Sequence, residues 1–125
     1  MYNNGIHYWT IMLNYKNGIG GVYMLMNVSV LLLIISVLFK VFKPKKRNCL
    51  YGYRTTLSKS SQKMWDEAQR YSSTILIIVS CILLVLGLLL KNLTFQYDIE
   101  VNLVLILTGL ASIFIFTEKH LKGVI

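Results

Sequence analysis

Apolar residues fall into three long blocks, at residues 22–39, 72–90 and 101–117, separated by polar segments. Each block is 17 to 19 residues long and contains neither a charged residue nor a proline. A helix rises about 1.5 Å per residue and the hydrocarbon core of a membrane is about 30 Å thick, so each block can span it, the third only just. The pattern predicts an all-α integral membrane protein with three transmembrane helices, over residues 22–42, 72–90 and 101–117.

Two other interpretations of these blocks fit less well. Buried helices of a soluble protein would need polar outer faces, whereas these blocks are apolar all round and the chain is 55% hydrophobic. A cleaved signal peptide would begin earlier and follow a basic segment, but only Lys16 precedes the first block.

The distribution of charge predicts the orientation in the membrane. The net charge is +8, and nine of the thirteen Lys and Arg residues lie between the first two blocks. They are Lys40, Lys43, Lys45, Lys46, Arg47, Arg54, Lys59, Lys63 and Arg70. Because basic loops stay in the cytoplasm, we expect the 43–71 loop and the 118–125 tail inside, with residues 1–21 and the 91–100 connection outside.

The N-terminal segment, residues 1–21, mixes polar, aromatic and aliphatic residues. Tyr8, Trp9 and Tyr15 suit the membrane interface, where an amphipathic ring is half hydrated. A disordered leader, or a natural start nearer Met24, fits the same composition. The sequence leaves these three interpretations open.

Small and weakly polar residues lie within the predicted spans, several of them seven residues apart. They are Asn27, Ser29 and Ser36 in the first block, Ser73, Ser80 and Gly87 in the second, and Asn102, Thr108, Gly109 and Ser112 in the third. Such residues let helix backbones approach closely in lipid, so we expect them at helix interfaces. For Asn27 we favour a hydrogen bond across the bundle over a place in a binding cavity.

The 43–71 loop carries signals for a turn and a helix. Pro44 discourages helix before it and should end the extension of the first helix, and Gly52 allows the chain to turn back. A cap at Ser60 or Ser61 precedes a run with an apolar face. The face consists of Met64, Trp65, Ala68 and Tyr71. We therefore expect a short amphipathic helix lying on the inner leaflet and leading into the second span.

Acidic residues fall early in this predicted helix, where the helix dipole favours anions. They are Asp66 and Glu67. Arg54 could pair with either of them, or bind a lipid phosphate.

Several loop residues together form a motif that resembles a known family. They are Asn48, Gly52, Tyr53, Arg54, Thr55, Ser58, Ser61, Trp65 and Ala68, and they follow a run of basic residues interrupted by Pro44: Lys43, Lys45, Lys46 and Arg47. This region resembles the signature of the SdpI family of bacterial membrane proteins. Gln69 stands where that family often has Asn, and Thr56 where Pro is common. The family's founding member is longer and has additional spans.

This resemblance implies antiparallel helices in the bacterial cytoplasmic membrane. The motif residues either bind a partner or only fold the loop, and the sequence leaves both open. The resemblance also implies immunity against a secreted peptide toxin, together with a sensing or signalling role. The basic run favours anionic lipid headgroups as partners over nucleic acid, because it is short and adjoins a membrane helix. The alternatives are an accessory or structural membrane protein, or a small transporter that would have to be oligomeric.

The reactive residues do not suggest an enzyme. Ser58, Ser60, Ser61 and Cys49 lack an evident activating base, with only His120 on the predicted cytoplasmic side. His7 and His120 are predicted on opposite sides of the membrane. We expect no catalytic site, no metal site and no cofactor. Since no charged residue lies within the spans, a proton-coupled transporter is also disfavoured.

The predicted topology can be tested with single cysteines in a background lacking Cys49 and Cys81. Asn4→Cys and Gln96→Cys should react with membrane-impermeant thiol reagents applied to intact cells, whereas Lys59→Cys should react only after the cells are opened. The reverse labelling would show that the basic loop lies outside and that the charge argument fails.

Overall fold

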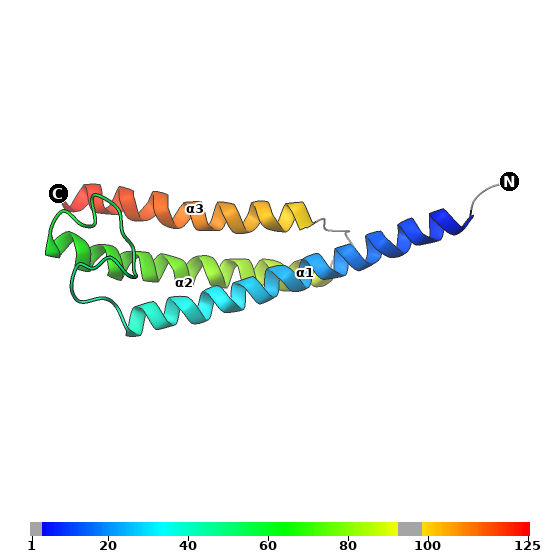
Figure 1. Ribbon diagram of the computed structural model, residues 1–125, viewed down its shortest axis with the longest axis horizontal. Helices are drawn as coiled ribbons and strands as arrows, with labels where there is room; N and C mark the ends of the chain where they lie inside the picture. Colours follow the sequence, from blue (N-terminus) through cyan, green and yellow to red (C-terminus); the bar gives the residue numbers. More distant parts are fainter. Residues whose placement is uncertain (1–3, 93–98) are drawn as a thin grey trace.

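The computed structural model describes residues 4–92 and 99–125, which form three helices. An irregular loop over residues 42–61 joins the first two. The helices are α1 (Asn4–Val41), α2 (Gln62–Asn92) and α3 (Ile99–Val124). Successive helices run antiparallel, and α1 extends beyond the other two at its N-terminal end (Figure 1). The 42–61 loop and the C-terminus lie together at the opposite end of the bundle, here called the loop end (Figure 1).

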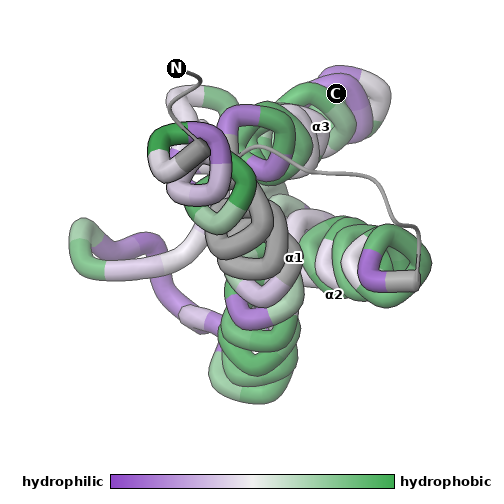
Figure 2. Tube along the Cα trace, turned by 90° about the vertical axis from the view of Figure 1, so that its right-hand side faces the viewer, coloured by the Kyte–Doolittle hydropathy of each residue, from purple (hydrophilic) through white to green (hydrophobic). Residues whose placement is uncertain are grey.

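Each helix contains a stretch that is long and apolar enough to cross a membrane. These stretches are Tyr23–Val41, Gln62–Lys91 and Glu100–Val124. Hydrophobic residues cover the helices, whereas hydrophilic residues gather in the loop (Figure 2). Large side chains such as Leu31, Leu89 and Leu107 are more than half exposed, as expected for surfaces that lipid covers. The prediction of an all-α membrane protein with three spanning helices is confirmed.

Most of the small residues that the sequence indicated line the helix interfaces, but Thr108 is exposed. Ser29, Ser36 and Ser80 are completely buried. A Cβ atom added to Gly109 would lie 3.0 Å from a methyl group of Val79, so α3 approaches α2 closely at this point. The serine hydroxyls donate to carbonyl groups of their own helices, which satisfies them without a cross-helix bond. Close packing, rather than hydrogen bonding between helices, is therefore their contribution.

Asn27 does not take part in this packing, and its predicted hydrogen bond across the bundle is wrong. Its side chain is exposed, whereas Leu25 and Ser29 on either side are buried. Two residues along a helix rotate a side chain by about 200°, so Asn27 points away from the bundle. The buried amide is instead that of Asn102 in α3, which is fully buried and has no hydrogen-bond partner among the described residues.

The helices are longer than the apolar blocks. The predicted 1–21 segment is helical from Asn4 onward and continuous with α1, so a disordered leader over residues 4–21 is wrong. Tyr8 and Trp9 are exposed on this extension, while the side chain of Tyr15 lies outside the described part. The 118–125 tail is helical as far as Val124. Most of the predicted 91–100 connection, residues 93–98, lies outside the described residues.

Replacing Gly109 should test the close contact between α2 and α3. Gly109→Leu would force a side chain into Val79 and Leu83, and overpacking of this kind costs about 1–3 kcal/mol. Thr108→Leu places the same side chain on the exposed face of the same helix and should have little effect. Unfolding in detergent micelles would measure both, and equal losses of stability would mean that the interface is not where the structure has it.

Candidate functional site

The loop end forms a compact unit, here called the loop assembly, built from the loop and the adjoining ends of α2 and α3. It comprises the 42–61 loop, residues 62–73 of α2 and residues 113–124 of α3. A small hydrophobic cluster lies at its centre. The buried members are Met64, Ala68 and Leu121, and Tyr53, Leu57 and Val124 pack against them.

Trp65 connects α2 to the exit of α1. Its side chain is completely buried, and its indole nitrogen donates a hydrogen bond of 2.9 Å to the carbonyl oxygen of Pro44. A buried tryptophan needs such a partner for its N–H. Helix α1 ends at Val41, three residues before Pro44, as the proline predicted. The chain leaving α1 is thus fixed against the first turns of α2.

Gln69 holds the middle of the loop through two hydrogen bonds. Its amide oxygen accepts from the backbone N–H of Tyr53 at 2.8 Å, and its amide nitrogen donates to the Tyr53 carbonyl oxygen at 2.7 Å. One side chain therefore satisfies both backbone polar groups of a loop residue, as a neighbouring β-strand would. The side chain of Gln69 is 5% exposed, so these bonds are sheltered from water.

Gly52 makes this approach possible. Its φ angle is +104°, a conformation that other residues rarely adopt. A Cβ atom here would lie 2.6 Å from the amide oxygen of Gln69 and 2.9 Å from Pro44. The turn predicted at Gly52 is confirmed, and glycine is required there for space as well as for conformation.

Tyr53 connects the loop to α3. Its hydroxyl lies 3.0 Å from a carboxylate oxygen of Glu118 and 3.3 Å from the carbonyl oxygen of Phe114. Burial raises the pKa of the Tyr53 hydroxyl far above its ordinary value, and the hydrogen bond to Glu118 raises it further. The hydroxyl therefore remains protonated and serves as a donor.

The polar motif residues satisfy the loop backbone. Thr55 and Ser58 bond reciprocally, each side-chain oxygen accepting from the other residue's N–H, at 2.8 and 3.1 Å. The side-chain oxygen of Asn48 accepts from two backbone N–H groups just after it, which closes a turn. Ser61 caps α2 by accepting from the N–H of Met64 at 3.2 Å, as predicted.

Arg54 does not form the predicted ion pair with Asp66 or Glu67. Its side chain is exposed and donates to the carbonyl oxygen of Cys49 within the loop. Asp66 instead accepts a hydrogen bond from Gln62. Arg54 is therefore a motif residue whose guanidinium lies at the surface of the loop assembly.

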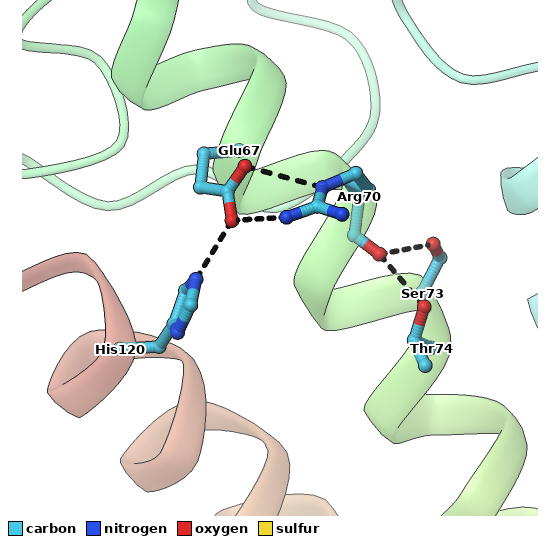
Figure 3. A network of polar contacts seen from close by, with 5 residues as sticks. All are labelled: Glu67, Arg70, Ser73, Thr74 and His120. Carbon is cyan, nitrogen blue, oxygen red and sulfur yellow. Dashed lines mark hydrogen bonds and ion pairs between the residues drawn. The ribbon is translucent and has the colours of Figure 1, made fainter. Parts of the chain in front are cut away.

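Glu67 takes part in a network that the sequence did not reveal. Its carboxylate accepts two hydrogen bonds from Arg70, at 2.7 and 3.1 Å, and lies 2.7 Å from the imidazole Nε2 of His120 in α3 (Figure 3). The imidazole also stacks on the ring of Tyr71, with centroids 3.9 Å apart. In the sequence His120 is a lone histidine, and its neighbours along the chain do not indicate these partners.

The predicted amphipathic helix on the inner leaflet is instead the first part of α2. No break separates it from the spanning segment, because residues 62–92 form one helix. Its apolar face does not rest on lipid, since Met64, Trp65 and Ala68 are buried by the loop and by α3. The apolar pattern therefore marked a protein interface.

The basic residues before the motif are at the surface. Lys43, Lys45, Lys46 and Arg47 are all exposed, and Arg47 donates to the carbonyl oxygen of Lys59 at 3.0 Å. Within residues 4–92 and 99–125, no three His, Cys, Asp or Glu side chains gather as a metal site would require. Cys49 and Cys81 are both exposed and are not disulfide-bonded.

Comparisons with known proteins agree with the motif. A model of the SdpI/YfhL protein family matches residues 45–117, which include the loop assembly as far as Thr117. The chain is 39% identical over 92 residues to an uncharacterized protein, YfhL, of Bacillus subtilis (strain 168). That alignment covers 74% of this chain and 80% of the relative. No solved structure matches the chain.

The bonds between Gln69 and Tyr53 should carry much of the stability of the loop assembly. Gln69→Leu leaves the sheltered N–H of Tyr53 without a partner, at a cost of about 1–3 kcal/mol, and leaves the Tyr53 carbonyl with only the longer bond from Ser58. Lys63→Leu is the control, because Lys63 is exposed on the same helix and surface substitutions usually change stability by less than about 0.5 kcal/mol. Unfolding in micelles and protease sensitivity of the loop would measure the difference. Equal stability and equal protease sensitivity of the two variants would show that Gln69 does not hold the loop as described.

Proposed function

The chain belongs to the SdpI/YfhL protein family, and we propose that it protects a bacterium against a secreted peptide toxin from within the cytoplasmic membrane. Family membership is the observation that carries this proposal, through the immunity that the family resemblance implies. In the proposed orientation, the basic loop assembly and the C-terminus lie in the cytoplasm. The N-terminal part of α1 and the connection between α2 and α3 lie outside.

The geometry of the loop assembly favours binding and transmission over catalysis. The hydroxyl groups of Ser58, Ser60 and Ser61 all engage backbone groups, which leaves them poorly placed as nucleophiles. Two other motif side chains connect helices, Trp65 to the chain leaving α1 and Tyr53 to α3. We therefore propose a non-enzymatic role in which the loop fixes the inner ends of the helices.

A continuous α1 offers a physical route from the outer surface to the loop. Tyr8 and Trp9 are exposed on its outer part, where a peptide approaching the membrane would meet aromatic side chains. The same helix continues without interruption to Val41, close to the bond between Trp65 and Pro44. A contact made outside would thus act on a rigid element whose other end is held by the loop assembly.

Arg54 is the motif residue best suited to separate a functional role from a structural one. Its guanidinium is exposed, so removing it should leave the fold intact. A charged side chain at the surface of a structured loop is available to a cytoplasmic partner or to a phosphate group. This role would serve the sensing or signalling activity proposed for the loop.

Protection should be measured in a toxin-sensitive bacterium that expresses this protein and is challenged with peptide toxins encoded near its gene. We expect wild type to protect, and Arg54→Ala to lower the tolerated toxin concentration about tenfold, the equivalent of one charged hydrogen bond. Lys59→Ala, another exposed cation of the loop, should protect as wild type does. Membrane levels of the three proteins must be equal.

Two outcomes would contradict parts of this proposal. Full protection by Arg54→Ala would remove the role of Arg54 while leaving immunity in place. Absence of protection by wild type against each such peptide would remove immunity itself. An accessory or structural membrane protein would then be the better description.

A further inference from the structure

A cavity of about 300 Å³ lies beneath the loop assembly, where the inner ends of the three helices diverge. Its wall includes Phe39 of α1, Tyr53 of the loop, Gln69 and Leu76 of α2, and Leu110 and Phe114 of α3. Its volume is at the lower end of the range for ligand pockets, and most such pockets are apolar with a few polar groups. The structural roles described above do not account for this space.

The wall of the cavity changes from polar to apolar along α2. Gln69 lies at the loop end, and Leu76 lies seven residues deeper in the span, a rise of about 10 Å. Ser72 and Ser73 lie between them. The deeper wall is completed by leucine, isoleucine and phenylalanine side chains of α3. An occupant that matches this wall is apolar at its deep end and polar near the loop.

Apart from the Ser72 hydroxyl, the polar side chains of the wall are already bonded within the protein. The amide of Gln69 binds the backbone of Tyr53, the Tyr53 hydroxyl lies against Glu118, and the Ser73 hydroxyl donates to the carbonyl of Arg70. A polar ligand would have to break these bonds. A hydrocarbon chain would not, and it would fill the space with dispersion contacts.

The cavity is open toward the surface that the bilayer covers. Leu110 and Phe114, which form one side of its mouth, are 40% and 54% exposed. Lys40, which directly follows Phe39 in α1, is exposed at the same end, and the basic run of the loop follows it. Positive charge thus lies at the depth of the lipid headgroups, where it attracts anionic ones.

We propose that this cavity binds one acyl chain of an anionic phospholipid, with the headgroup held near Lys40. The chain enters between α1 and α3 and lies along α2 beneath Tyr53. The bound lipid fills the gap left where α1 and α3 separate, and so supports the loop assembly from the membrane side. This site does not involve a toxin, so a failed test of lipid binding would leave the proposed protection untouched, and the reverse also holds.

The test is to purify the protein in mild detergent with equal amounts of phosphatidylglycerol and phosphatidylcholine of identical chains, and to record bound lipid by native mass spectrometry. Wild type should retain one phospholipid, predominantly phosphatidylglycerol. In Leu110→Trp the new side chain fills the cavity, so the amount of retained phospholipid should fall at least tenfold. Leu107→Trp lies one turn away on the lipid-exposed face of α3 and should retain it, since Leu107 does not line the cavity.

Further variants keep the test decisive if Leu110→Trp does not fold. Ser72→Leu narrows the cavity from α2 and should also lower retention, whereas Thr74→Leu, outside the wall, should not. Lys40→Gln should abolish the preference for phosphatidylglycerol, and Lys122→Gln at the end of α3 should leave it unchanged. Equal retention by cavity and control variants, retention of a peptide instead of lipid, or no retained lipid would overturn the proposal. Equal binding of the two lipids by wild type would overturn the role of Lys40.

Discussion

The two hydrogen bonds between the Gln69 side chain and the backbone of Tyr53 are the constraint on which the loop end depends. A loop beside a membrane has to satisfy its backbone polar groups without the ladders of a helix or a sheet. Gln69 provides both partners at once, and it can do so only because Gly52 leaves room for its amide. With Tyr53 held in this way, its hydroxyl reaches Glu118, and the loop is bonded to both α2 and α3.

Two further connections make the three helices a single unit at the loop end. Trp65 binds the chain leaving α1, and Glu67 with His120 joins α2 to α3. Each connection links segments far apart in the sequence through a side chain on α2. Helix α2 is therefore the element around which the other two are arranged, as its central position in the bundle also indicates (Figure 1). Outside this region the helices meet through small residues and through a buried apolar cluster, which give proximity but little direction. The cluster consists of Leu25, Val79, Leu83 and Ile106.

The loop contains residues that fix its conformation and residues that face its surroundings, and this difference has a functional consequence. Most of the motif holds the loop in one conformation, and the exposed Arg54 and the basic run before it are what the loop presents to its surroundings. The cavity beneath the loop is lined in part by Gly52 and Tyr53 of the motif. The loop assembly therefore has two exposed sides, the cavity between the helices and the loop surface that carries Arg54.

The sequence alone determined the three spans, the packing stripes, the turn at Gly52 and the cap at Ser61, because each depends on local composition, periodicity or backbone freedom. It could not determine the partner of Arg54, the direction of Asn27 or the contact between Glu67 and His120. The face formed by Met64, Trp65 and Ala68 shows why. An apolar stripe indicates that a surface avoids water, but lipid and protein satisfy it equally. Only the fold, by bringing the loop and the end of α3 over these residues, decided that protein covers them.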